Sequence, residues 1–207
     1  AASDVYKRQV AESFADFEDM LSLSVLLGGR PVRGRSLAGA SNAGFECVAL
    51  ADHLAGWSLA DLAPATSASL QDLLAKGGVD SLVSVKNPLD LTPMIGDEIF
   101  ARSVEVLLAD PGVDLGVFGC VPLTGSLDTL PAAAAHPEDL DLETSIASRL
   151  ATVWGATTKP WIVVVDSGPA YDPLAERLSA AGIPVFRTMD RALRILTLYS
   201  GELSYSG

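Results

Sequence analysis

The chain has 207 residues, of which 49% are hydrophobic and 19% charged, and its formal net charge is -12. This length and apolar content suit one large domain with a buried core and exclude a disordered chain. The sequence lacks the clustered lysines and arginines of a nucleic-acid-binding protein and any apolar run near the ~18 residues of a membrane span. Two cysteines, Cys47 and Cys120, are too few for a disulfide framework and predict buried thiols in a reducing cytoplasm.

The first nine residues are expected to be foreign to the fold. The run Asp-Val-Tyr-Lys-Arg-Gln at positions 4–9 resembles the translation of a transposase adapter used in sequencing libraries. We therefore predict a non-native segment over residues 1–9, with the natural sequence starting near Val10. The alternative is an ordinary helical N-terminus.

Residues 10–34 are predicted to form a connector helix and a linker. Phe14, Phe17, Leu21 and Val25 recur at helical spacing, which predicts a helix over 10–27. Two glycines then end the helix, and the linker runs to residue 34.

Residues 35–199 alternate between apolar strands and amphipathic helices. Strands are predicted over 36–40, 82–85, 113–120, 161–166 and 184–187, and 58–62 could form a further one. Helices are predicted over 45–55, 66–75, 97–109, 142–154, 172–181 and 189–199. Thr66 or Ser67 is the expected N-cap of the second of these helices, and Gly77-Gly78 its end. The alternation predicts a doubly wound α/β domain with a five-stranded parallel sheet, followed by a short tail over 200–207.

Four polar loops follow predicted strands, and ligands of open α/β sheets bind beyond the carboxyl ends of the strands. The first loop, Ser41-Asn42-Ala43-Gly44, leads into a helix whose N-terminus could hold a phosphate. The other loops span 87–93, 121–126 and 166–169. They contribute these candidate site-edge residues: Asn87, Asp90, Thr92, Thr124, Ser167 and Gly168.

Other interpretations of the first loop stay open. Asn42 could simply cap the helix. Glu46, in the first helical turn, would either repel an anion or only favour the helix dipole. The loop has no Walker lysine and no GxGxxG, so it is neither a P-loop nor a dinucleotide fingerprint.

The sequence offers no self-contained catalytic set. His53 and His136 are expected to be packing or solvated residues. No group of histidines, cysteines and carboxylates has metal-ligand spacing, so we expect no metal site. Ser167 lacks the GxSxG frame of a nucleophile elbow.

Five segments, in order, resemble motifs of ADP-forming acyl-CoA synthetases of the acetate–CoA ligase type, which are relatives of succinyl-CoA ligase. Ser41-Asn42-Ala43-Gly44 with Ala51-Asp52 resembles "TNAGG…AAD", and Asn87-Pro88-Leu89-Asp90-Leu91-Thr92 resembles "NPxDxT". Residues 108–114, 159–164 and 181–192 resemble the "ADPGVD" turn, the "KPVxV" strand and the closing "AGIPVFRSPERAxRAL" segment. The similarity covers about residues 10–198.

This resemblance implies a flavodoxin-like domain of an enzyme that interconverts acyl-CoA, ADP and phosphate with acid, CoA and ATP. It implies that residues 41–44 face a phosphohistidine supplied by another domain, with Asn87 and Asp90 shaping the same edge. CoA, ATP or ADP, and Mg would be bound by the complete enzyme and not by this domain alone. Its partners would be CoA-binding and ATP-grasp domains or subunits, and the fragment alone is expected to be inactive. The chain departs from the usual double glycine with Pro-Gly, carrying Gly44-Phe45-Glu46-Cys47.

Two alternatives to the enzyme remain. The domain could be a non-catalytic binding or regulatory module, for example fused to an acetyltransferase, which Phe45 and Glu46 favour. A flavin-binding protein is disfavoured, because the first loop lacks the run of hydroxyls that a flavin phosphate needs.

Overall fold

The computed structural model describes residues 11–203, in which six strands form one parallel sheet. The strands are β1 (Ser36–Ser41), β2 (Ser58–Leu59), β3 (Leu89–Asp90), β4 (Leu115–Gly119), β5 (Trp161–Val164) and β6 (Val185–Phe186). Five of them follow the order β2-β1-β4-β5-β6. The strand β3 pairs with the last two residues of β1, and β2 pairs with the first two. This confirms the predicted doubly wound parallel sheet, with four of the five predicted strands, the optional one at 58–62 and the additional short strand β3.

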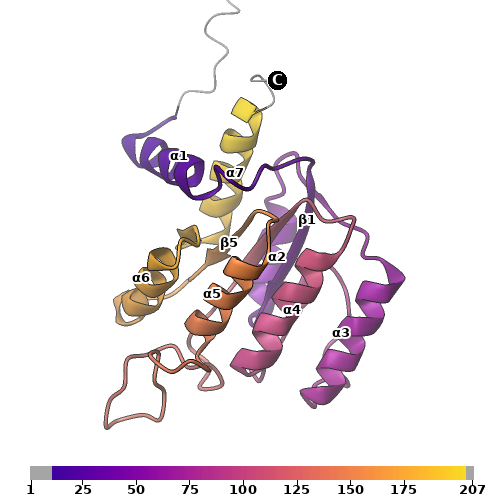
Figure 1. Cartoon of the computed structure of the whole chain (residues 1–207), viewed down its shortest axis with the longest axis vertical. Coiled ribbons are helices and arrows are strands. Elements are labelled where there is room, and N and C mark those ends of the chain that lie inside the picture. Colours follow the sequence, from indigo (N-terminus) through magenta and orange to yellow (C-terminus); the bar gives the residue numbers. More distant parts are fainter. Residues whose placement is uncertain (1–10, 204–207) are drawn as a thin grey trace, which may run out of the picture.

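Helices cover both faces of the sheet, as a doubly wound fold requires (Figure 1). The helices α3 (Pro64–Lys76), α4 (Asp97–Ala109) and α5 (Ile146–Ala156) lie side by side on one face. On the other face α2 (Gly44–Asp52) packs beside α7 (Met189–Leu203), and α1 (Phe14–Leu26) packs on α7. The remaining helices are η1 (Pro169–Tyr171) and α6 (Asp172–Ala180), which lies beside α5.

The core lies on both sides of β4 and β5, whose residues are all buried. Phe118 meets Trp161 edge to face at 5.7 Å between ring centroids, and Trp154 meets Trp161 in the same way at 5.3 Å. Burial of one such side chain contributes about 1.5–3 kcal/mol. The near-continuous apolar strands thus form the two-sided core that their composition predicts.

The predicted strand over 82–85 is wrong, because that stretch forms no ladder. The flank of β1 is already occupied by β2 at its start and by β3 at its end. Between them the side chain of Asn87 fills the gap. Its Oδ1 accepts from the N–H of Gly39 at 2.9 Å, and its Nδ2 donates to Leu37 O at 2.7 Å and Ala60 O at 3.0 Å.

Three predicted helix ends are corrected by local chemistry. The helix α3 begins at Pro64 after Ala63, not at Thr66 or Ser67, because proline suits the first turn. The helix α5 begins after Ser145, whose hydroxyl accepts from Ser148 N–H at 3.4 Å, so residues 142–145 precede it. The helix α7 continues to Leu203, so residues 200–203 of the expected tail are helical.

The first helix buries a different face from the one its apolar spacing suggests. Its inner residues are Asp16, Met20 and Leu23, whereas Phe14, Phe17, Leu21 and Val25 are 53–75% exposed. Asp16 receives two hydrogen bonds from the guanidinium of Arg194, at 2.6 and 2.9 Å. These hydrogen bonds lower the pKa of Asp16 to about 2. The inner face of α1 thus combines this ion pair with the buried apolar side chains of Met20 and Leu23.

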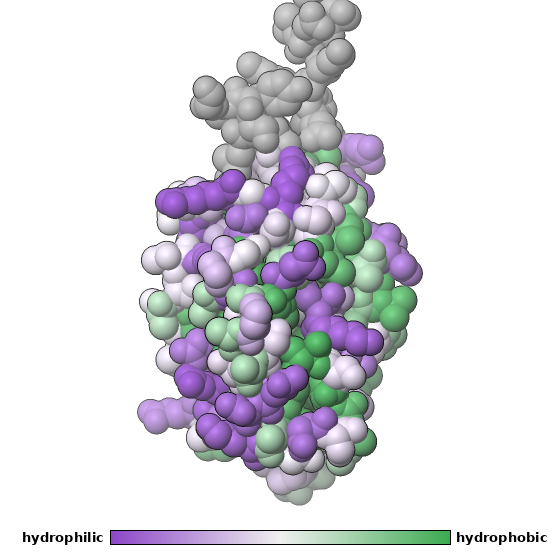
Figure 2. Space-filling view, turned by 90° about the vertical axis from the view of Figure 1, so that its right-hand side faces the viewer, coloured by the Kyte–Doolittle hydropathy of each residue, from purple (hydrophilic) through white to green (hydrophobic). Residues whose placement is uncertain are grey.

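The predicted non-native segment 1–9, the expected start at Val10 and residues 204–207 lie outside the described residues. Among the helices of residues 11–203, none has the length and hydropathy to cross a bilayer. Figure 2 shows hydrophobic surface between hydrophilic side chains on the side of the molecule that lies to the right in Figure 1.

Candidate functional site

Three of the four predicted loops follow the adjacent strands β1, β4 and β5, and the fourth, over 87–93, contains β3. Ser41 at the end of β1 is in register with Asp90 of β3 on one side and with Gly119 of β4 on the other, and Gly119 is in register with Val164 of β5. The chain leaves β1 for β2 in one direction and reaches β4 in the other, so the strand order reverses between β1 and β4. The structure therefore places the first loop at the switch point, where ligands of such sheets bind.

Asn42 holds this switch point together and does not cap the helix. Its amide exchanges two hydrogen bonds of 2.8 Å with the backbone of Val121, which joins the ends of β1 and β4. Asn42 is completely buried, and the N-cap of α2 is Ala43, whose side chain offers no hydrogen bond. The capping interpretation of Asn42 is therefore wrong.

The turn itself leaves the N-terminus of α2 without a side-chain cap. Ser41 Oγ accepts from the N–H of Ala43 at 3.1 Å, which orients the turn. The N–H groups of the first helical turn have no partners within a helix, and they carry the positive end of its dipole. Gly44 and Phe45 are the residues that present them here.

Glu46 is buried directly beside this turn. The Ser41 hydroxyl donates to its Oε2 at 3.4 Å, and its Oε1 is a buried atom with no partner among the described residues. A Cβ atom on Gly119 would collide with this carboxyl group, so the strand β4 leaves room for it. Burial, together with the negative charge of Asp166, raises the pKa of Glu46 to about 7.

Asp90 and Thr92 form the rim of the turn on the β3 side. A Cβ atom on Gly44 would lie 2.6 Å from Asp90 Oδ2, so only glycine lets the carboxylate come this close. Asp90 Oδ1 accepts from the N–H of Thr92 at 3.0 Å. Thr92 has a φ of 63°, which is rare for a β-branched residue and marks strained backbone.

The loops after β4 and β5 carry two further unsatisfied groups. Thr124 Oγ1 and Ser167 Oγ are buried atoms without a hydrogen-bond partner among the described residues. The carbonyl of Ser167 accepts from Arg187 at 2.7 Å, which anchors the loop, and Gly168 is exposed beside it. Buried polar groups normally find partners. Besides these two hydroxyls and Glu46 Oε1, the buried atoms His136 Nδ1 and Trp161 Nε1 also lack one among the described residues.

Not all predicted site residues meet at this edge. The structure brings together Ser41, Ala43, Gly44, Asp90 and Thr92 around the turn, while Asn87 lies deeper, where it bridges β1 and β2. Residue spacing alone gave no sign of the role of Gly119, because a glycine in an apolar strand indicates only close packing.

The cysteines and histidines differ in their burial. Cys120 is buried, as predicted, but Cys47 is half-buried, with Sγ 3.6 Å from Leu89 O. Burial raises the pKa of the Cys47 thiol to about 12 and that of Cys120 further. His53 is exposed at the end of α2, and His136 is half-buried. No three metal-ligating side chains gather within residues 11–203.

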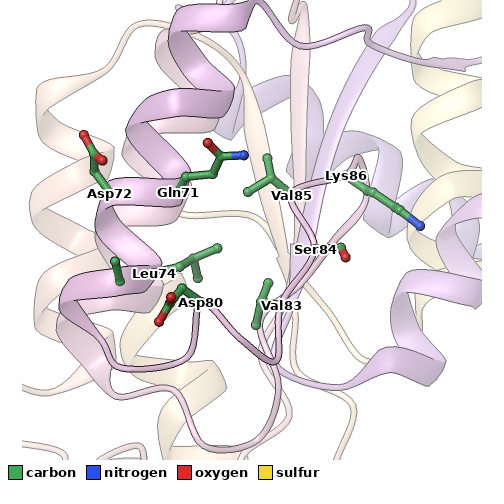
Figure 3. A pocket seen from close by; sticks show the side chains of 9 residues that line it. Gln71, Asp72, Leu74, Asp80, Val83, Ser84, Val85 and Lys86 are labelled. Carbon is green, nitrogen blue, oxygen red and sulfur yellow. The ribbon is translucent and has the colours of Figure 1, made fainter.

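A separate cavity of about 630 Å³ lies between α3 and residues 80–86 (Figure 3). Its walls combine Leu74, Val83 and Val85 with Asp72, Asp80 and Lys86. It contains none of the residues that the sequence singles out, and its mixed charges select no ligand.

No protein-family model matches the chain, and no curated protein matches it. Solved structures do. The chain is similar to PH0766 from Pyrococcus horikoshii OT3, with a TM-score of 0.74 and 25% identity over 96% of this chain and 42% of that one. It is also similar to the dinucleotide forming acetyl-coenzyme A synthetase 1 of Ca. Korarchaeum cryptofilum. The form in complex with phosphate and ADP gives a TM-score of 0.72, and the apo form 0.69.

Both synthetase structures are 22% identical to this chain and align with 94% of it. The likeness confirms the flavodoxin-like fold. The chain spans about two fifths of the length of the structures it matches, since they are covered to only 39–42%.

Proposed function

We propose that this chain is a domain of an ADP-forming acyl-CoA synthetase, in which the turn 41–44 presents the N-terminus of α2 to a phosphohistidine from another domain. CoA, the nucleotide and Mg would be held by those other domains. The observation that carries the proposal is the uncapped N-terminus of α2 at the switch point of the sheet. Phosphoryl transfer is catalysed mainly by positioning and by preorganised donors, which such a helix end supplies.

The fold supports this assignment in a second way. The structure of the acetyl-coenzyme A synthetase with phosphate and ADP overlaps 94% of this chain. Of the five sequence motifs that resemble the synthetases, those over 41–44 and 87–92 lie at this edge, and two others include β5 and β6. The motif over 108–114 forms the end of α4 and the turn before β4. The proposal gives the chain no catalytic residue of its own, because it holds no histidine at the turn.

The proposal is tested by expressing the whole gene that contains this segment and measuring ATP formation from acetyl-CoA, ADP and phosphate. We expect turnover, and we expect Ala43→Asp to lower kcat at least tenfold, because a fixed carboxylate would occupy the helix end. Ser69→Asp adds the same charge to the exposed face of α3 and is the matched control. Absence of CoA-binding and ATP-grasp domains, or equal activity of both variants, would refute the assignment.

A second function, a non-catalytic binding module, is favoured by one observation. The carboxylates of Glu46, Asp90 and Asp166 surround the turn, and negative charge weakens an anion site. In that case the whole protein would bind a ligand at this edge without forming ATP. Phosphorylation of the whole protein by labelled ATP separates the two functions, since only the synthetase forms a phosphohistidine.

A further inference from the structure

The carboxyl group of Glu46 is linked to the turn by a short chain of hydrogen bonds. Ala43 N–H donates to Ser41 Oγ, and the Ser41 hydroxyl donates in turn to Glu46 Oε2. The second oxygen, Oε1, is completely buried and has no partner among residues 11–203. A buried carboxylate without a cation is costly, so the protonated form is stabilised at this position.

The groups around Glu46 add negative charge or none. Asp166 at the end of β5 acts on it directly, Asp90 lies on the β3 side of the turn, and Asp97 at the start of α4 acts on the neighbouring Cys120. The thiols of Cys47 and Cys120 stay neutral at physiological pH, because their pKa values are raised. No ion pair of Glu46 with lysine or arginine is found in the part of the chain that the structure describes.

The protonation state of Glu46 therefore determines whether the electrostatic potential at the turn favours or disfavours an anion. With Glu46 neutral, the dipole of α2 and its free N–H groups favour an anion. With Glu46 ionised, a third carboxylate joins Asp90 and Asp166 beside the same helix end, and like charges in a partly buried site repel strongly.

We infer that Glu46 is a specificity-determining residue of the turn: a tetrahedral oxyanion binds at the N-terminus of α2 only together with a proton on Glu46. This inference rests on the proposed function, because it concerns the same phosphate-facing turn. On this inference the site takes up one proton for each anion bound. A turn built only of glycine and small residues has no group that could take up that proton. Glu46 acts through charge and is not itself a catalytic residue.

The test uses sulfate, which stays a dianion from pH 5.5 to 8.5, and the 207-residue chain at constant ionic strength. For a group with a pKa of about 7, we expect binding to weaken about 30-fold between pH 5.5 and 8.5. Glu46→Gln, which has the same shape and no charge, should bind equally at both pH values. Glu105→Gln, on the exposed face of α4, is the control and should behave like the wild type.

Calorimetry in two buffers of different ionisation enthalpy measures how many protons the wild-type chain takes up when it binds sulfate. At pH 8 we expect uptake of about one proton per sulfate. Sulfate binding with the same pH profile in the wild type and in Glu46→Gln, or without proton uptake, would overturn the inference and leave the proposed function standing. A lack of sulfate binding by both proteins at pH 5.5 would instead count against the phosphate-facing turn itself.

Discussion

At the scale of single residues, two glycines at the edge of the sheet make room for carboxyl groups, because a Cβ atom at either position would overlap one. Gly119 leaves room for Glu46, and Gly44 leaves room for Asp90. Neither requires glycine for its backbone dihedrals, since neither has a positive φ. Their role is steric, and it explains how a carboxyl group fits between β1 and β4.

We predict that Gly119→Ala destabilises the protein by about 1–3 kcal/mol, because the new Cβ meets the Glu46 carboxyl group and lies 2.8 Å from Ser41 Oγ. Urea denaturation measures the change. The double variant Gly119→Ala with Glu46→Ala should recover most of the loss, since it removes the colliding group. If the second substitution gives no recovery, Glu46 is not the group that Gly119 accommodates.

At the scale of elements, side-chain amides complete a sheet whose strands are too short to pair along their full length. Asn87 bridges β1 and β2, and Asn42 joins β1 to the residue after β4. The motif around Asn87 predicted a loop at the ligand edge. Because sequence spacing cannot show which backbone groups a side chain will reach, its role inside the sheet was not predictable.

We predict that Asn87→Ala costs about 1–3 kcal/mol, because it leaves Gly39 N–H and the carbonyls of Leu37 and Ala60 without these partners. The free energy of unfolding in urea is the measurement. Gln71→Ala, on the exposed side of α3, serves as the control and should change it by less than about 0.5 kcal/mol. Equal effects of the two substitutions would contradict the bridging role.

The contact between α1 and α7 makes a second prediction at this scale. Arg194→Met removes the cation that is hydrogen-bonded to the buried Asp16 and leaves Arg191 3.6 Å from it, and we expect α1 to exchange its amide hydrogens severalfold faster. Hydrogen exchange read by mass spectrometry over residues 14–26 measures this. Arg102→Met breaks an exposed pair with Glu105 and should leave α1 unchanged. Unaltered exchange of α1 in Arg194→Met would show that apolar contacts suffice.

At the scale of the whole molecule, the alternation of strands and helices was enough to predict the fold. Strong signals were the apolar run before Asp166 and the helix over 97–109, which has the predicted bounds. The helix of α1 was predicted but its inner face was not, because spacing shows which residues share a face but not which face is covered. The four loops were chosen from the predicted ends of strands, and the strand expected before the loop 87–93 does not form. The buried state of Glu46 depends on the size of Gly119, a residue distant in the sequence.

The pH dependence of stability belongs to the same scale. The raised pKa of Glu46 means that folding favours its protonated form, so stability is lost as pH rises from about 4.5 to about 7. Asp97 acts in the same direction, because burial raises its pKa. Asp16, with a pKa of about 2, acts in the opposite direction, and its contribution is lost as pH falls below 3.8.

We therefore predict the highest urea midpoint near pH 4.5. Between pH 4.5 and 8, Glu46→Gln should reduce the loss of stability by up to about 3 kcal/mol, because a neutral amide does not ionise. Urea titrations of both proteins across this range give the comparison. Parallel curves for the two proteins would show that Glu46 ionises as readily in the folded chain as in the unfolded one.

The packing of α1 on α7 also determines how this domain can be connected to other chains. The first described helix and the last one lie together at one end of the sheet, and the long loop after β4 extends from the opposite end (Figure 1). Incoming and outgoing polypeptide can therefore meet on one side, as in domains that tolerate insertion into a host chain or circular permutation. Such a fold can be inserted between neighbouring domains, with the loop after β4 on the side away from both connections.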